Sequence, residues 1–319
     1  MSTPSASASA APQGAHPPLL ELQGIRLAFK AVRAVEDVSF KVRRHEICAV
    51  IGPNGAGKSS ILNIVSGVYR PDAGSVAFDG ERRSHMLPRQ TAQQGIARTF
   101  QNIAVFKGMS VLENLLTGTT LRFESSWLEQ LLWLGRAKGA ERREREHAER
   151  VLEFLELQPY RDAPVGRLAY GLQKRVELGR ALAAAPQLLL LDEPMAGMNA
   201  SEKQSMSEAI LDVNRQLGTT IVLIEHDMRV VMDISDHVVV LDHGRVVGDG
   251  TPDEVRQNPD VLRAYLGSRR QAAQTQSQSA ASDITDPPDA SAILAASAPA
   301  ASAASAAPAP SPASIAAST

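Results

Sequence analysis

A glycine-rich stretch in the first fifth of the sequence has the residue types and order that bind nucleotide phosphates. It reads Gly52, Pro53, Asn54, Gly55, Ala56, Gly57, Lys58, Ser59 and Ser60, and its first eight residues fit G-x-x-x-x-G-K-[ST]. Glycines let main-chain amides approach phosphate oxygens, and the positive end of a following helix adds to the attraction. Lys58 would neutralise the β- and γ-phosphates, and the Ser59 hydroxyl would bind Mg²⁺. The stretch therefore predicts a site for a nucleoside triphosphate and Mg²⁺.

An acidic pair further along the chain has the chemistry that hydrolysis of such a ligand requires. Asp192 and Glu193 directly follow the four leucines 188–191. Because buried parallel strands open at their carboxyl ends onto a ligand crevice, Asp192 is predicted to hold Mg²⁺ through water, and Glu193 to act as general base. His226 follows a second apolar run, 220–224, and is predicted as a second catalytic residue that reaches the terminal phosphate.

Composition excludes several other classes of protein. The 319 residues contain 33 Lys and Arg against 35 Asp and Glu, a net charge of -2, so no general positive field attracts nucleic acid. The single cysteine, Cys48, allows no internal disulfide and no zinc knuckle. No apolar run approaches the ~20 residues of a membrane-spanning helix. We therefore expect a cytoplasmic protein with no nucleic-acid partner and no metal besides Mg²⁺.

The elements that must position these residues follow an α/β pattern. The apolar run 47–51 precedes the glycine-rich stretch, and 59–68 has helical spacing. The runs 188–191 and 220–224 are each preceded by a helical pattern, as in parallel strands that are buried on both faces. Residues 111–157 are mostly helical in pattern and predict a separate helical layer.

Both ends of the chain differ in composition from the rest. Residues 1–18 are rich in Ser, Ala and Pro, and residues 269–319 are rich in Ala, Ser, Pro and Gln. Too few apolar side chains are present there to offset the entropy lost on ordering. We expect a disordered leader at 1–18, a disordered tail at 269–319, and a functional domain between them at 19–268.

The order of these motifs resembles the ATP-binding subunit of ABC transporters. The glycine-rich stretch resembles Walker A, residues 188–193 resemble Walker B, and residues 168–173 between them resemble the ABC signature. The resemblance implies an α/β P-loop NTPase (RecA-like) core with an N-terminal antiparallel β subdomain and an inserted helical subdomain at about 103–172. The ABC nucleotide-binding domain would then be residues 19–268.

The same resemblance assigns further residues to the nucleotide site. The signature residues Ala169, Tyr170 and Gly171 would complete the site of an opposite subunit, so that a dimer holds two ATP molecules. Gln101 would contact Mg²⁺ and sense the membrane partner, and Phe29 would stack on adenine. Residues 196–199 resemble the D-loop. The apolar residues after Gln101, namely Ile103, Val105 and Phe106, are either a docking surface for permeases or part of a helix core.

Departures from the common ABC signature narrow the resemblance to one branch of the ABC transporter family. Ala169 and Tyr170 replace the usual serine and glycine, as in the larger-insert ATPase of high-affinity branched-chain amino acid importers, and residues 258–267 resemble the end of that ATPase. This implies uptake of branched-chain or related amino acids through two permease subunits, with a second copy or a paralogous ATPase, and indirectly a solute-binding protein. The chain would lie peripherally on the cytoplasmic face of the inner membrane.

Three alternative functions are each disfavoured by one feature of the residues. The ATPase of lipopolysaccharide export has a similar order and a similar Tyr-Leu-Gly ending, but a more ordinary signature with serine. A soluble ABC ATPase that acts on DNA or ribosomes would need a long coiled-coil insertion or a second nucleotide domain. A GTP-dependent switch would need an N-K-x-D sequence, which does not follow the glycine-rich stretch.

Overall fold

The computed structural model describes residues 17–119 and 136–264. The predicted tail, 269–319, lies outside the described residues, as does nearly all of the predicted leader, 1–18, so their predicted disorder is not tested. Within the described part of the chain, every helix is too short or too polar to cross a bilayer.

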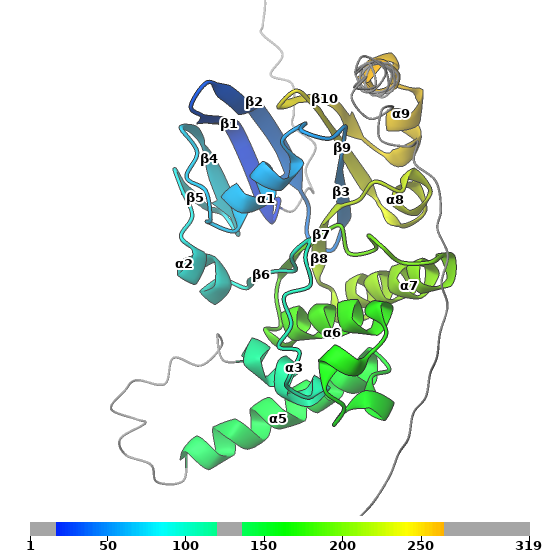
Figure 1. The fold of residues 1–319 in the computed structure, drawn as a ribbon. Coiled ribbons are helices and arrows are strands. Elements are labelled where there is room, and N and C mark those ends of the chain that lie inside the picture. The colour runs from blue at the N-terminus through cyan, green and yellow to red at the C-terminus, as the bar shows by residue number, and fades with distance from the viewer. Residues whose placement is uncertain (1–16, 120–135, 265–319) are drawn as a thin grey trace, which may run out of the picture. The chain divides into compact units, whose positions relative to one another are not determined.

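A six-stranded sheet forms the centre of the fold (Figure 1), with the strand order β10-β9-β3-β8-β7-β6. The strands are β3 (Ile47–Ile51), β6 (Ile96–Arg98), β7 (Leu188–Asp192), β8 (Thr220–Ile224), β9 (His237–Asp242) and β10 (Arg245–Gly250). All neighbours are parallel except β9 and β10. Every residue of β3, β7 and β8 is buried, which explains their unbroken apolar sequences. The prediction of an α/β fold with a parallel sheet is confirmed.

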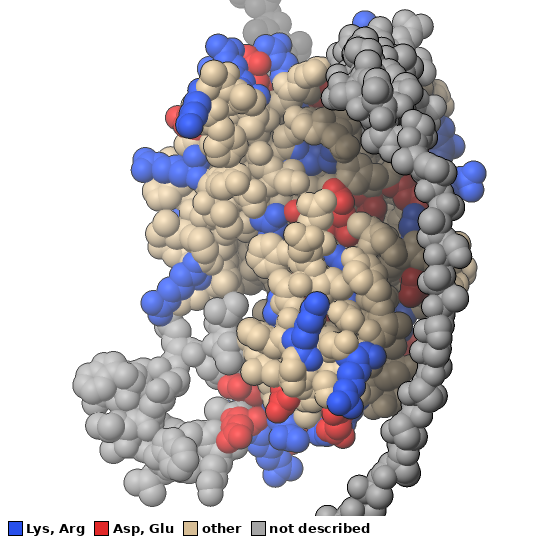
Figure 2. All heavy atoms as spheres, viewed as in Figure 1, with Lys and Arg blue, Asp and Glu red and all other residues tan. Residues whose placement is uncertain are grey.

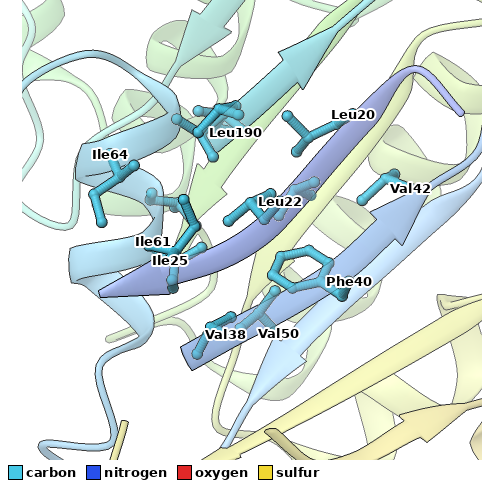
Figure 3. Packing of buried hydrophobic residues seen from close by; sticks show 14 of the residues in the cluster. Leu20, Leu22, Ile25, Val38, Phe40, Val42, Val50, Ile61, Ile64 and Leu190 are labelled. Atoms are coloured by element: carbon cyan, nitrogen blue, oxygen red, sulfur yellow. The ribbon is translucent and has the colours of Figure 1, made fainter. Parts of the chain in front are cut away.

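A second, antiparallel sheet is formed by the N-terminal strands, in the order β2-β1-β4-β5. These are β1 (Leu20–Phe29), β2 (Val32–Val42), β4 (Ala73–Phe78) and β5 (Glu81–Arg83). Its inward side chains share one cluster with helix α1 (Lys58–Val65) and with strands of the central sheet. Figure 3 shows this packing for Leu20, Leu22, Ile25, Val38, Phe40, Val42, Val50, Ile61, Ile64 and Leu190. The cluster fixes α1, and therefore the glycine-rich loop before it, between the two sheets.

Helices cover the other face of the central sheet. Successive residues of β7 point to opposite faces, so Leu188 and Leu190 join the cluster around α1, and Leu189 and Leu191 join a second cluster. The second cluster contains residues from α3 (Val111–Thr119), α5 (Arg136–Phe154), α6 (Tyr170–Ala183) and α7 (Ala200–Leu217). Two short 3-10 turns, η2 (Gln158–Tyr160) and η3 (Val165–Arg167), connect α5 to α6. The boundaries of a helical subdomain at about 103–172 stay a prediction.

The remaining helices complete the packing around the sheets. Helix α2 (Pro88–Gln93) precedes β6, and α8 (Met228–Ile234) and α9 (Pro252–Gln257) pack with β3 and β9 in a third cluster. The face drawn in Figure 2 carries basic and acidic side chains interspersed among uncharged ones.

Candidate functional site

The glycine-rich loop lies between the end of β3 and the start of α1, as the sequence predicts. Two of its glycines are required by close main-chain contacts: a Cβ atom on Gly52 would lie 2.0 Å from the Leu241 carbonyl oxygen, and one on Gly57 would lie 2.4 Å from that of Ala34. Both have positive φ angles, 145° and 98°. Gly57 is the N-cap of α1 and supplies no side-chain acceptor to the first amides of the helix. An anion is the complementary ligand for such a helix end.

Lys58 crosses the loop that precedes it. Its Nζ donates hydrogen bonds to the carbonyl oxygens of Gly52 and Pro53, both at 2.8 Å, and the residue is only 6% exposed. Burial lowers the pKa of Lys58, and the charges of Glu193 and Asp192 oppose that effect. A buried ammonium held by neutral carbonyl oxygens is well suited to bind a phosphate. The loop residues thus fit a nucleotide.

Asp192 ends β7 with one carboxylate oxygen paired and the other free. Its Oδ2 accepts a hydrogen bond from Arg98 Nη2 at 2.8 Å, and the two side chains are 4% and 9% exposed. Its Oδ1 is buried without a hydrogen-bond partner among the described residues. A buried free carboxylate oxygen costs free energy unless a ligand such as a hydrated cation meets it. The donor chemistry of Asp192 therefore fits Mg²⁺.

Arg98 is a residue of this site that the sequence analysis missed. It is the last residue of β6 and also donates hydrogen bonds to Asn63 Oδ1 at 2.5 Å and to Ser66 Oγ at 3.1 Å, both near the end of α1. Its guanidinium carbon lies 5.3 Å from the centre of the Phe100 ring. The only signal in the sequence is a charged residue three positions before Gln101, which by itself does not predict burial.

Glu193, Gln101 and His226 lie together at the carboxyl ends of three neighbouring strands. Glu193 Oε2 accepts a hydrogen bond from Gln101 Nε2 at 3.0 Å, and Glu193 Oε1 lies 2.7 Å from His226 Nε2. They follow β7, β6 and β8, and these strands are adjacent in the sheet. Glu193 is held in a left-handed conformation, φ 50°, with its amide bonded to the Ile224 carbonyl oxygen at 2.9 Å. Such strain is typical of functional positions.

Glu225, between β8 and His226, was also missed. Its Oε1 accepts a hydrogen bond from the Met195 amide at 2.8 Å, and its Oε2 accepts one from the His226 amide at 3.1 Å. Burial raises the pKa of Glu225 despite these bonds. The carboxyl group therefore fixes the main chain that presents both Glu193 and His226.

The residues that resemble the ABC signature lie on a different layer from the glycine-rich loop. Ala169 is the N-cap of α6, and α6 belongs to the cluster on the sheet face opposite to α1. Tyr170 is 45% exposed and lies against the segment 196–199, where a Cβ atom on Gly197 would lie 3.3 Å from Tyr170 Cε1. A Cβ atom on Gly171 would lie 2.7 Å from Glu202 Oε1 in the first turn of α7. These residues are thus assembled with α7.

Two further predicted positions lie at the surface. Phe29 ends β1 and is 45% exposed, and its ring packs edge-on against that of Tyr69 with 5.2 Å between ring centres. The segment 99–110 contains no helix of its own. Whether its apolar residues form a docking surface or part of a helix core stays a prediction. Val105 packs against the second cluster, whereas Phe106 is 51% exposed.

Comparisons with known proteins agree with this geometry. A family model described as "ABC transporter" matches residues 35–196, and one described as "Branched-chain amino acid ATP-binding cassette transporter" matches residues 245–270. The high-affinity branched-chain amino acid transport ATP-binding protein BraF of Pseudomonas aeruginosa is 39% identical over 250 residues, which are 78% of this chain and 98% of that protein. The LivG protein of the same description in Escherichia coli is 37% identical with the same coverage.

Solved structures give the same assignment. The crystal structure of a nucleotide-free ATP-binding cassette from an ABC transporter is 31% identical, has a TM-score of 0.68, and is matched over 78% of this chain and 99% of that chain. The ADP conformation of an ATP-binding cassette of an ABC transporter is 32% identical, has a TM-score of 0.69, and is matched over 79% and 100%. With its glycine-rich loop, its acidic pair and these relatives, the chain belongs to the ABC transporter family, as an ATP-hydrolysing nucleotide-binding cassette with the P-loop NTPase fold.

Proposed function

We propose that this chain hydrolyses ATP to drive the uptake of branched-chain or related amino acids through two separate permease subunits. The contact of Glu193 with both Gln101 and His226 at the carboxyl end of the sheet carries the catalytic part of the proposal. The substrate class is supported by the names of the two relatives described above and by the second family model at residues 245–270.

The nucleotide is held by the loop and by the helix that follows it. Lys58 exchanges its two carbonyl partners for phosphate oxygens, and the uncapped amides of α1 bind the same group. Ser59, Asp192 and Gln101 would hold Mg²⁺, with Asp192 acting through water. The ion would neutralise phosphate charge as it develops during transfer. The exposed ring of Phe29 supplies a stacking surface for adenine.

Glu193 accepts the proton of the attacking water. Both of its oxygens are hydrogen-bonded, one to Gln101 and one to His226. Each carboxylate oxygen can accept a second hydrogen bond, so the attacking water can bind Glu193 beside these partners while Gln101 controls the orientation of the base. His226, 44% exposed in its side chain, can turn towards the terminal phosphate while Glu225 holds its amide.

Transport by this ATPase would require other protein chains. Ala169, Tyr170 and Gly171 would complete the nucleotide site of a second copy or a paralogous ATPase, because in this chain they lie on the other side of the sheet from α1. The permeases would dock on the exposed apolar side chains of the segment after Gln101, including Phe106 and Met109. A solute-binding protein would act on the permeases, and the chain would lie peripherally on the cytoplasmic face of the inner membrane.

The substitution Glu193→Gln tests the catalytic part. We expect ATP binding to persist, steady-state hydrolysis to be abolished, and a nucleotide-bound dimer to accumulate in size-exclusion chromatography. Glu153→Gln, at an exposed position on α5, is the matched control. Unchanged hydrolysis in the Glu193 variant would remove this residue from the catalytic role.

Purification of the tagged chain from its own detergent-solubilised membranes tests the transport part. We expect two multi-spanning permeases and a second ATPase to co-purify. Recovery of lipid-export components would leave the ATPase assignment in place and overturn the amino acid substrate.

A further inference from the structure

The main chain around Gln101 is bonded to side chains of helix α6. The amides of Phe100 and Ala104 both donate hydrogen bonds to Glu177 Oε1, each at 3.2 Å. The carbonyl oxygen of Gln101 accepts a hydrogen bond from Lys174 Nζ at 3.0 Å. The two α6 side chains therefore hold the loop on both sides of the residue that contacts Glu193.

Lys174 and Glu177 form a buried ion pair with little exposure to water. Their side chains are 1% and 2% exposed, and Lys174 Nζ lies 3.8 Å from Glu177 Oε2. Each charge is nearer to the loop main chain than to the other charge. Buried charges are stable only when they are paired and hydrogen-bonded. Separation of the loop from α6 would deprive both charges of main-chain partners.

The next part of the loop is bonded to the helical layer in the same manner. Asn114 of α3 is fully buried, accepts a hydrogen bond from the Phe106 amide at 2.8 Å, and donates one to the Phe106 carbonyl oxygen at 3.0 Å. By contrast, the Thr99 amide donates to the carbonyl oxygen of Leu190 in β7 at 2.9 Å. The main chain thus changes its attachment from sheet to helices between Thr99 and Phe100.

We propose that Lys174 and Glu177 are positioning residues that make the loop 100–104 and helix α6 move as one unit. The inference rests on the proposed function, because it assigns these residues to the control of Glu193 by Gln101. Helix α6 begins at Tyr170, about one turn before Lys174 and two turns before Glu177. A partner that displaces the loop therefore withdraws Gln101 from Glu193 and shifts the signature residues in the same movement.

Hydrogen exchange of the full-length chain tests the attachment directly. In the Glu177→Ala protein without nucleotide, we expect the peptide that covers residues 99–106 to exchange roughly tenfold faster or more than in the original chain. The reason is that two amides lose a charged acceptor. Glu177→Gln keeps an acceptor oxygen and should give an intermediate rate. Arg175→Met is the matched control, since Arg175 contacts the Leu155 carbonyl oxygen, Glu156 and Ser205 rather than the loop.

Two further measurements separate positioning from a merely structural role. In Glu177→Ala and Lys174→Met, we expect kcat for ATP to fall about fivefold or more while KM stays within about twofold, because Lys58 and α1 are untouched. On addition of ATP, the exchange of the loop peptide and of the peptide that contains Tyr170 should change together in the original chain. In Glu177→Ala, the change in the Tyr170 peptide should no longer accompany that of the loop.

The results divide clearly. Loop exchange in Glu177→Ala equal to that in Arg175→Met would overturn the proposal. A kcat for ATP in Glu177→Ala and Lys174→Met that is no lower than in Arg175→Met would overturn it as well. If Glu177→Ala does not fold, Glu177→Gln and Lys174→Met give the same readings. Absence of ATP hydrolysis in the original chain would refute the proposed function, whereas the nucleotide-free exchange rates would still test the attachment of the loop to α6.

Discussion

Replacement of Arg98 by methionine should destabilise the fold strongly, because it leaves the Asp192 carboxylate buried and unpaired. The guanidinium contacts Asp192, Asn63 and Ser66, and its side chain is 9% exposed. Removal of one partner from a buried ion pair costs about 3–5 kcal/mol. For a chain of this size each kcal/mol corresponds to about 2–4 °C, so we expect Tm to fall by at least about 6 °C.

Thermal unfolding of the nucleotide-free chain measures this effect. The assay compares Arg98→Met, Asp192→Asn and the double variant, which together form a double-mutant cycle. The double variant should recover a substantial part of the Tm that Arg98→Met loses, because its amide at position 192 is neutral. Arg142→Met is the control: the ion pair of Arg142 with Glu146 is exposed, 82% and 51%, and such pairs contribute at most about 1 kcal/mol.

Two results would refute the reasoning. A decrease in Tm for Arg98→Met as small as that for Arg142→Met would mean that the buried pair contributes little to stability. A double variant no more stable than Arg98→Met would mean that the unpaired Asp192 charge is not the source of the cost.

Two other predictions concern the nucleotide loop and a half-buried histidine. Lys58→Ala should weaken ATP binding by about tenfold or more, since a charged hydrogen-bond donor to phosphate is lost, and equal dissociation constants in a fluorescent-nucleotide titration would contradict this. The hydrogen bond with Asp249, followed by those with Cys48 and Glu46, raises the pKa of His237 from 6.5 to about 12. The folded state therefore keeps a proton that the unfolded state loses above pH 6.5, so this stabilisation is complete below pH 6.5 and is lost progressively as pH rises towards 12. Denaturant unfolding between pH 7 and 9 should show a decline of up to about 1.4 kcal/mol per pH unit that His237→Gln removes, and an unchanged slope in that variant would refute the assignment.

The sequence by itself determined the parts of the site that depend on local main-chain geometry. The conformation of a phosphate-binding loop depends on the glycines within the loop itself, so residues 52–59 could be assigned without knowledge of the fold. The apolar runs 47–51, 188–191 and 220–224 also predicted buried parallel strands, because a strand covered on both faces has no polar positions. The acidic pair 192–193 could then be placed at a strand end.

Only the tertiary structure decided which of these residues meet. Glu193 contacts Gln101 and His226, which are 92 and 33 residues away, because β6, β7 and β8 are neighbours in the sheet. Arg98 and Glu177 could not be predicted as site residues, because a charged side chain in a sequence is usually exposed to water. Their burial depends on partners that long-range packing supplies, and such packing has no local pattern in the sequence.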